Sequence, residues 1–143
     1  MSMQVLDTKN FYDILFDLSN KERQKADMEK LNADFFKDNF NLIKEEETQL
    51  EKLDEDERRK KELFIHNARR MLKEIYERRI KKVTQMALNK SKTGTLLIDT
   101  SNMLSDEHEL FKELVEVFDK SRSSKMNLFY KPETDGELIA QPQ

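Results

Sequence analysis

The side chains that could take part in catalysis or bind a metal are few and widely spaced. The two histidines, His66 and His108, lie far apart in the sequence, and neither belongs to an HExxH motif. We expect His66 to be a structural residue beside the apolar stripe of its helix and His108 to be exposed. The run Glu45-Glu46-Glu47 fans across about 200° of a helix, so these carboxylates cannot converge on one ion. They predict a solvated helix face.

The remaining polar motifs fit no reaction. The segment Asp99-Thr100-Ser101-Asn102 is typical of a turn, because an EF-hand loop needs a longer alternating series and a central glycine. GxSxG, Walker and glycine-rich phosphate motifs do not occur. The chain has no cysteine, which excludes disulfides, thiolate zinc sites and cysteine nucleophiles. The sequence therefore predicts a protein that is not an enzyme and that takes no cofactor and no metal.

A basic stretch is the remaining candidate site. Residues 27–55 carry ten acids and four bases, whereas residues 56–92 carry five acids and thirteen bases. The bases could pair with the acidic helix before them, bind an acidic protein partner, or contact nucleic acid, which requires a basic surface that neighbours do not neutralise. The net charge of −3 argues against a primary DNA-binding role, so DNA is expected at most indirectly. The residues concerned are Arg69, Arg70, Lys73, Arg78, Arg79, Lys81 and Lys82.

Long helices are expected because the first glycine or proline of the chain is Gly94. Apolar residues at helical spacing predict four helices, beginning near Thr8, near Asn32, at Asp56 and at Ser105. The third should run over residues 56–89. Residues 90–104 are predicted to be a loop in which residues 95–98 could pair as a short strand. The apolar pattern stops after residue 121, so we predict a helical domain over residues 1–121 and a linker or tail over residues 122–143.

The fold class predicted is all-α, an elongated bundle of about four helices with one long central helix. That helix would measure about 50 Å, against a radius of gyration of about 14–15 Å for a compact globule of this length. Apolar residues make up 36% and charged residues 38% of the chain, so the core is lean. Such helices usually complete their burial against another subunit, which predicts an oligomer. The expected interface residues are Phe11, Tyr12, Leu15, Tyr76, Ile80 and Val83.

A plain coiled-coil or bundle adaptor is the alternative interpretation. The apolar residues of the second and third helices could form a zipper seam. The stripes change phase, however, and four separate helices carry apolar faces, which favours a folded bundle.

Nothing in the sequence predicts membrane insertion. The longest apolar run is only Leu96-Leu97-Ile98, and the first ten residues lack the features of a signal peptide. The expected location is cytoplasmic and nucleoid-associated, or nuclear for a eukaryotic source.

Two stretches resemble archaeal GINS subunits of the type that begins with the helical domain. One is the long basic helix ELFIHNARRMLKEIYERRIKKVTQMAL (Glu62 to Leu88), and the other is NMLSDEHELFKELVEVF (Asn102 to Phe118). The early segments FYDIL and LNADFFKDNFNLI agree with the same pattern. The likeness covers roughly residues 8–121.

The resemblance implies a non-catalytic scaffold subunit of a GINS complex, a tetramer built from one or two kinds of subunit. Its partners would be other GINS subunits, the MCM helicase and a RecJ-like nuclease homologue, which the complex holds together in DNA replication. The long third helix would lie in the subunit interfaces. Such subunits usually continue into a small β domain, for which the residues after 121 are too few, so docking by that domain is not implied here.

Overall fold

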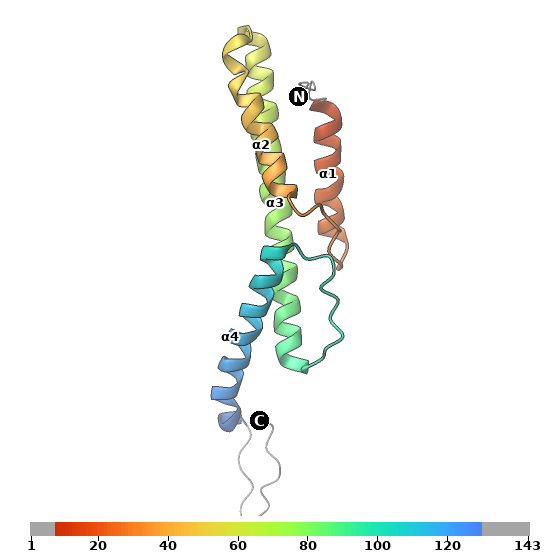
Figure 1. The fold of residues 1–143 in the computed structure, drawn as a ribbon, viewed down its shortest axis with the longest axis vertical. Helices are drawn as coiled ribbons and strands as arrows, with labels where there is room; N and C mark the ends of the chain where they lie inside the picture. The colour runs from red at the N-terminus through yellow and green to blue at the C-terminus, as the bar shows by residue number, and fades with distance from the viewer. Residues whose placement is uncertain (1–7, 130–143) are drawn as a thin grey trace, which may run out of the picture. The chain divides into compact units, whose positions relative to one another are not determined.

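The regular structure of the chain is helical throughout the part that the structure describes (Figure 1). A computed structural model describes residues 8–129, and no strand occurs among them. This confirms the predicted all-α fold with one long central helix. The elements are α1 (Thr8–Gln24), α2 (Phe35–Thr48), the 3₁₀ turn η1 (Leu50–Lys52), α3 (Glu55–Thr93) and α4 (Ser105–Phe129).

The chain forms two compact units, and α3 contributes to both. The first unit contains the residues up to Lys82 together with Asn102–Leu104. The second contains Val83–Ser101 and the residues from Ser105 onward. Among the described residues, the first unit therefore holds α1, α2, η1 and most of α3, and the second holds the end of α3, the following loop and α4.

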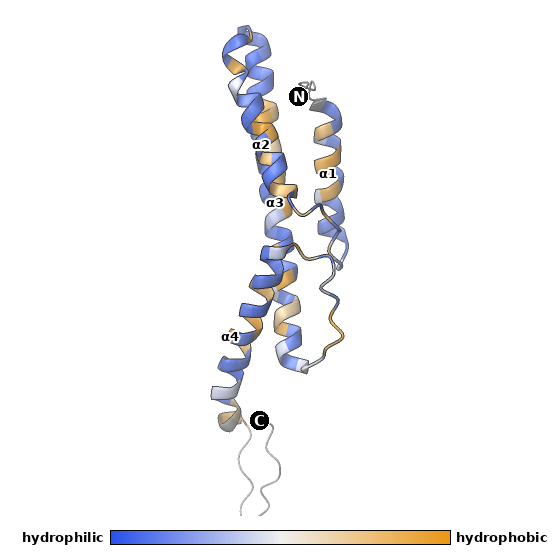
Figure 2. Cartoon of the chain, viewed as in Figure 1, coloured by the Kyte–Doolittle hydropathy of each residue, from blue (hydrophilic) through white to orange (hydrophobic). Residues whose placement is uncertain are grey.

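The core of the first unit is built where α1, α2 and α3 meet. Figure 2 shows hydrophobic colour on these helices and a hydrophilic end to the α2–α3 pair. Residues Phe11 and Leu15 of α1 are one helical turn apart, and both enter this core. Helix α1 runs through Ser19 and Asn20 without a break and continues to Gln24. Ser19 is buried and lies 3.5 Å from the Glu74 carboxylate of α3, so its hydroxyl has a partner there. The other core residues are Ile43, Ile65, Ala68, Met71, Leu72 and Ile75.

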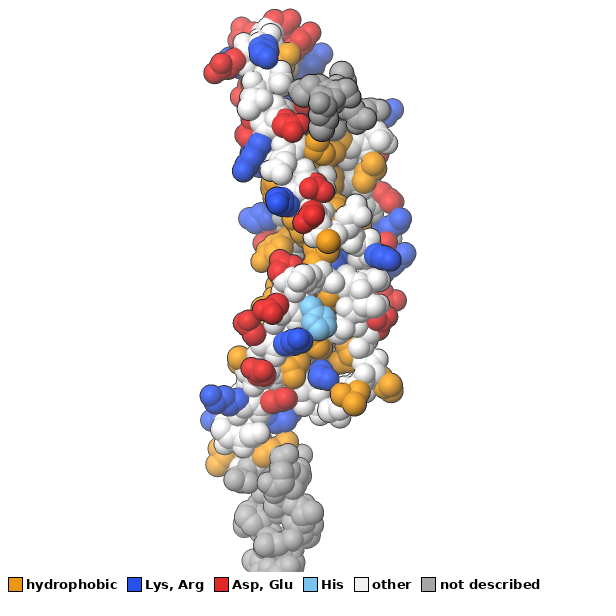
Figure 3. Space-filling model, viewed as in Figure 1, with side chains coloured by type: hydrophobic (Ala, Val, Ile, Leu, Met, Phe, Trp, Pro, Cys, Tyr) orange, Lys and Arg blue, Asp and Glu red, His pale blue; other side chains and the backbone are white. Residues whose placement is uncertain are grey.

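Helices α2 and α3 form an antiparallel hairpin (Figure 1). Near its turn, Glu46 forms an ion pair with Lys61; far from the turn, the rings of Phe36 and Tyr76 lie 6.1 Å apart. The Asp54 carboxylate accepts the backbone N–H of Glu57 at 2.9 Å, which caps the start of α3. Acidic side chains gather at this closed end of the hairpin (Figure 3), where three acids occupy the first turn of α3. Pairing of basic residues with the acidic helix before them, one of the three roles considered for these residues, therefore occurs in this hairpin.

In the second unit α3 and α4 run parallel. Leu88 of α3 lines one groove with Phe118 of α4, and Ser91 accepts a hydrogen bond from Arg122 at 3.4 Å. The residue numbers of these pairs differ by nearly the same amount, as expected for two helices that run in the same direction. Helix α3 ends at Thr93, one turn later than predicted. The next residue, Gly94, has a φ of 68° and donates its N–H to the Lys90 carbonyl at 2.8 Å, which is a left-handed C-terminal cap.

The connection and the end of α4 also differ from expectation. Residues 95–98 form no strand but belong to an irregular loop, in which Leu96 and Leu97 are exposed. Helix α4 continues past residue 121, where we expected the helical pattern to stop, and ends at Phe129. The rest of the predicted tail and the side chain of Thr8, the expected helix cap, lie outside the described residues. No helix in the described part of the chain is both long and apolar enough to cross a bilayer.

Candidate interaction surface

The basic residues predicted to form an outward surface do not all face outward. Arg79 is completely buried, and its guanidinium contacts the Glu22 carboxylate of α1 at 2.6 Å. Lys82 is nearly buried and reaches the other oxygen of the same carboxylate, also at 2.6 Å. The prediction that these two residues form an external contact is therefore wrong. They turn inward because α1 places a buried carboxylate against the same face of α3.

We call Glu22, Arg79 and Lys82 the Glu22 cluster. Beyond the two ion pairs, the Arg79 guanidinium donates to the carbonyls of Glu29 at 2.8 Å and Asn102 at 2.9 Å. The Lys82 ammonium donates to the Asp27 carbonyl at 2.8 Å. A buried ion pair is tolerated only when additional hydrogen bonds satisfy its remaining polar atoms, and these carbonyls do so. The cluster thereby attaches the loop between α1 and α2 to α3.

The backbone around the cluster adds two further bonds. The Glu22 carboxylate accepts the backbone N–H of Glu29 at 3.3 Å, and the Asn102 side-chain amide donates to the Met28 carbonyl at 2.9 Å. Segments from three parts of the sequence are thus held at one point. We conclude that Arg79, Lys82 and Glu22 are structural residues.

The other five basic residues are on or near the surface. Arg69 forms two hydrogen bonds of 2.8 Å with Glu47 of α2, and Arg70 pairs with Glu74 one turn away at 3.1 Å. The bonds from Arg69 lower the pKa of the Glu47 carboxyl and raise the pKa of Arg69 itself. Four of the seven predicted residues therefore pair with carboxylates of the chain itself. Lys73 and Lys81 are exposed and Arg78 is half-buried.

Three of the predicted interface residues belong to the interior. Phe11 and Leu15 lie in the core of the first unit, and Val83 is completely buried in the second. The expectation that these side chains remain exposed in a single chain is wrong, because the chain's own helices cover them. Tyr76 is 49% exposed, while Tyr12 and Ile80 are half-buried.

The exposed apolar residues of α1 flank its buried stripe. Successive helical residues are about 100° apart, so Ile14 and Phe16 lie on either side of Leu15. Leu15 is covered, but Ile14 is 55% exposed and Phe16 is 51% exposed. Tyr12 stacks on Phe16 with their ring centroids 6.1 Å apart. We define Tyr12 and Phe16, which are one helical turn apart, as the α1 surface; Ile14 is exposed on the opposite flank of Leu15.

A groove lies on the other flank of α1, where Ile14 is exposed. It has a volume of about 500 Å³ and lies between α1 and the loop that leads into α2. Two acids and two bases line it, and three of these four pair locally: Lys21 contacts Asp17 at 3.1 Å, and Glu29 contacts Lys25 at 3.5 Å; Lys30 is the fourth. The hydrogen bond that Lys21 donates to the Asp17 carboxylate raises the pKa of Lys21. This groove therefore offers apolar surface with little net charge.

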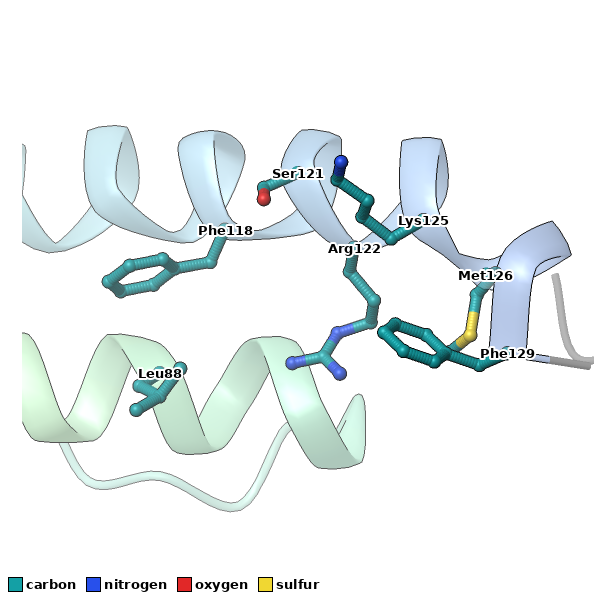
Figure 4. Close-up of a pocket in the computed structure, with 7 residues that line it drawn as sticks. All are labelled: Leu88, Phe118, Ser121, Arg122, Lys125, Met126 and Phe129. Carbon is teal, nitrogen blue, oxygen red and sulfur yellow. The ribbon is translucent and has the colours of Figure 1, made fainter.

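A second groove lies between α3 and α4 in the second unit (Figure 4), with a volume of about 380 Å³. Phe118 faces Leu88 across it, and Met126 and Phe129 lie together at its other end. Arg122 points from α4 toward α3 between these two apolar groups. We call it the α4 groove; Ser121 and Lys125 complete its lining.

The polar motifs considered for chemistry take structural positions. His66 is exposed on α3, whereas His108, predicted to be exposed, is half-buried and lies 3.4 Å from the Thr100 hydroxyl. Asp99 accepts both the N–H and the hydroxyl of Ser101, which lowers the pKa of Asp99, so the predicted turn is confirmed. Within residues 8–129 no group of three side chains is arranged to hold a metal ion.

The glutamate run was predicted to be a solvated face, and this holds only for one of its residues. Glu45 is exposed, but Glu46 and Glu47 are half-buried and pair with Lys61 and Arg69 across the hairpin. Helical fanning, which prevents the three carboxylates from sharing an ion, also directs two of them toward α3.

Comparison of the chain with protein-family models, with curated proteins and with solved structures finds no match. The candidate site therefore rests on geometry, and it consists of apolar surface and basic residues that the described chain leaves open.

Proposed function

We propose that this protein is a non-catalytic scaffold subunit that acts by joining other protein chains through apolar helix surfaces. The observation that carries the proposal is the α1 surface, where Phe16 is 51% exposed and stacks on Tyr12 although the neighbouring Leu15 is buried in the core. Large exposed apolar areas bordered by polar residues mark interaction sites in many proteins. Leu63 and Tyr76 of α3 are exposed as well, so the first unit offers apolar contacts on two helices.

The identity of the partners follows from the resemblance of residues 8–121 to archaeal GINS subunits. On that basis the chain would assemble with other GINS subunits into a tetramer and would link the MCM helicase to a RecJ-like partner during DNA replication. A scaffold of this kind works by differential binding, because it stabilises one arrangement of its partners and raises their effective concentration. A direct role for DNA is not part of the proposal, because Arg79 and Lys82 are used inside the fold.

The test combines a mass measurement with two neighbouring substitutions. Phe16→Glu places a charge on the α1 surface, and Leu15→Glu places the same charge in the core one residue away. Light scattering of the purified chain should give an oligomeric mass, and Phe16→Glu should reduce it to the monomer mass with its helical circular dichroism unchanged. Leu15→Glu should instead unfold the first unit, because a lone charge is expensive to bury.

The same samples are then mixed with purified MCM helicase and the RecJ-like protein. Binding of both and a gain in helicase activity would support the replication role. An oligomer that ignores both proteins would support the general adaptor instead. A wild-type chain that remains a monomer at micromolar concentration and binds neither protein would overturn the proposed function.

A further inference from the structure

We infer that the α4 groove is a docking site for an acidic amphipathic helix of a partner protein. The inference rests on the proposed function, since it assigns a partner chemistry to a second surface of the same scaffold. It concerns the second unit alone, and it is carried by the combination of open apolar residues with positive charges that pair with no carboxylate in the described part of the chain. Neither feature suffices by itself.

The floor of the groove is apolar and open. Leu88, Phe118 and Met126 line it and are half-buried, so they retain area that a ligand can cover. Phe129 at its end is 75% exposed. A volume of about 380 Å³ accommodates a few leucine-sized side chains but not a folded domain. A helix that inserts one apolar stripe into a groove matches this shape.

The charge of the groove is one-sided. Arg122 and Lys125 are among its lining residues, and no acidic residue is. The segment 120–129 contains three basic residues and no acid, although α4 begins with Asp106 and Glu107. The only hydrogen-bond partner of Arg122 among the described residues is the Ser91 hydroxyl, and neither Arg122 nor Lys125 pairs with a carboxylate there.

The contrast with the groove beside α1 identifies the ligand. There the lining charges balance, two acids against two bases, and Lys21 and Glu29 pair with neighbouring residues of the chain, so a ligand of one sign gains little from charge. In the α4 groove the cations have no carboxylate partner among residues 8–129, and a carboxylate of a ligand would form ion pairs with them. Nucleic acid would use the cations but not the apolar floor, so an acidic helix with an apolar stripe fits the whole groove better.

The experiment uses the full chain and a labelled peptide of about 18 residues, five helical turns. The peptide carries Leu at helical spacing with Glu on both sides, and fluorescence anisotropy measures its affinity. A second peptide replaces every Glu by Lys, and a third replaces every Leu by Ser. We expect the first peptide to bind and both others to bind at least about ten-fold more weakly.

Matched variants locate the binding. Phe129→Ser should lower the affinity for the acidic peptide about ten-fold. The control is Leu128→Ser, because Leu128 is 73% exposed on the same helical turn but does not line the groove; it should leave the affinity unchanged. The double variant R122E/K125E should no longer bind the acidic peptide and should bind the Lys peptide more tightly instead. Reversal of preference cannot result from unfolding, since an unfolded groove binds neither peptide.

Several results would overturn the inference. The first is equal affinity of the wild-type chain for the Glu and Lys peptides. The second is an equal loss of affinity for the acidic peptide in Phe129→Ser and Leu128→Ser. The third is that no peptide binds. Binding of a DNA oligonucleotide that R122E/K125E abolishes, without peptide binding, would make this a nucleic-acid surface. If R122E/K125E reduces an oligomeric chain to the monomer mass, the groove is occupied by a second copy of the chain. If E133Q/D135Q/E137Q binds the acidic peptide more tightly than the wild type does, the groove is occupied by the chain's own residues after 129. The mass of Phe16→Glu tests the proposed function separately.

Discussion

The Glu22 cluster makes the sharpest stability prediction for this protein. The perturbation is Glu22→Gln, which keeps the size and shape of the side chain and removes one negative charge. Both Glu22 and Arg79 have side chains with no solvent exposure, and Lys82 is only 13% exposed. The substitution therefore removes the negative charge that Glu22 supplies to a buried guanidinium and a nearly buried ammonium.

The expected cost follows from this geometry. Removing one member of a buried ion pair destabilises proteins by about 3–5 kcal/mol, because the other charge is left uncompensated. The carbonyls of Glu29, Asn102 and Asp27 still receive hydrogen bonds from the two cations, which limits the loss. We therefore expect about 3 kcal/mol, near the lower end of that range.

Urea unfolding followed by far-ultraviolet circular dichroism measures the effect. With a slope of about 2 kcal/mol per M urea, a loss of 3 kcal/mol lowers the midpoint by about 1.5 M. The matched control is Glu47→Gln, which removes the charge that pairs with Arg69 on the exposed side of the hairpin. Exposed pairs contribute little to stability, so its midpoint should move several-fold less.

A double variant tests the assigned cause. Adding Lys82→Met to Glu22→Gln removes the nearly buried Lys82 cation, which has lost its carboxylate partner. The urea midpoint of the double variant should therefore be higher than that of Glu22→Gln alone. In the wild-type background Lys82→Met should instead be destabilising, since it leaves Glu22 with one cation fewer. Equal midpoints for Glu22→Gln and Glu47→Gln, or additive effects of Glu22→Gln and Lys82→Met, would refute the reasoning.

Three further predictions concern other parts of the chain. Gly94→Ala should cost about 1–2 kcal/mol in urea unfolding, because the added Cβ meets no atom within 4 Å and only the positive φ resists it; an unchanged midpoint would contradict this cap. The hydrogen bonds from Ser101 lower the folded-state pKa of Asp99, so they stabilise the fold above the usual pKa and lose this effect as the pH falls through the lowered value. Nuclear magnetic resonance titration should show the low pKa of Asp99 and its rise in Ser101→Ala, whereas equal values would exclude the hydroxyl as the cause. Phe16→Glu should leave the urea midpoint within error while Leu15→Glu lowers it, and equal losses would mean that the α1 surface is covered by the chain itself.

Local structure was largely predictable from the sequence. The absence of glycine and proline before Gly94 and the helical spacing of apolar residues such as Phe11 and Leu15 predicted the helices that are found. The end of α3 was predicted one turn too early, although Gly94 was the available signal for its C-terminal cap. The basic end of α4 was also present in the sequence, since residues 120–129 carry three bases and no acid. Counting charge over residues 93–143 as a whole, which carry ten acids and five bases, hid this local excess, so the α4 groove was not predicted.

The predicted surfaces were less accurate, because periodicity shows which residues share a helix face but not which neighbour covers that face. Arg78 and Arg79 are identical in type and adjacent in sequence, yet only Arg79 is fully buried. Its partner, Glu22, lies 57 residues earlier in the chain. No local pattern connects the two positions.

The sequence by itself determined that this chain is helical, because helix formation depends on the spacing of apolar residues and on the position of glycine. It also determined that acidic and basic helices follow one another and pair. Tertiary structure decided which charges are buried and which apolar residues remain open, since α1 covers Leu15 but not Phe16. Burial of a side chain depends on the sum of contacts from distant segments, and those contacts exist only once the helices have packed.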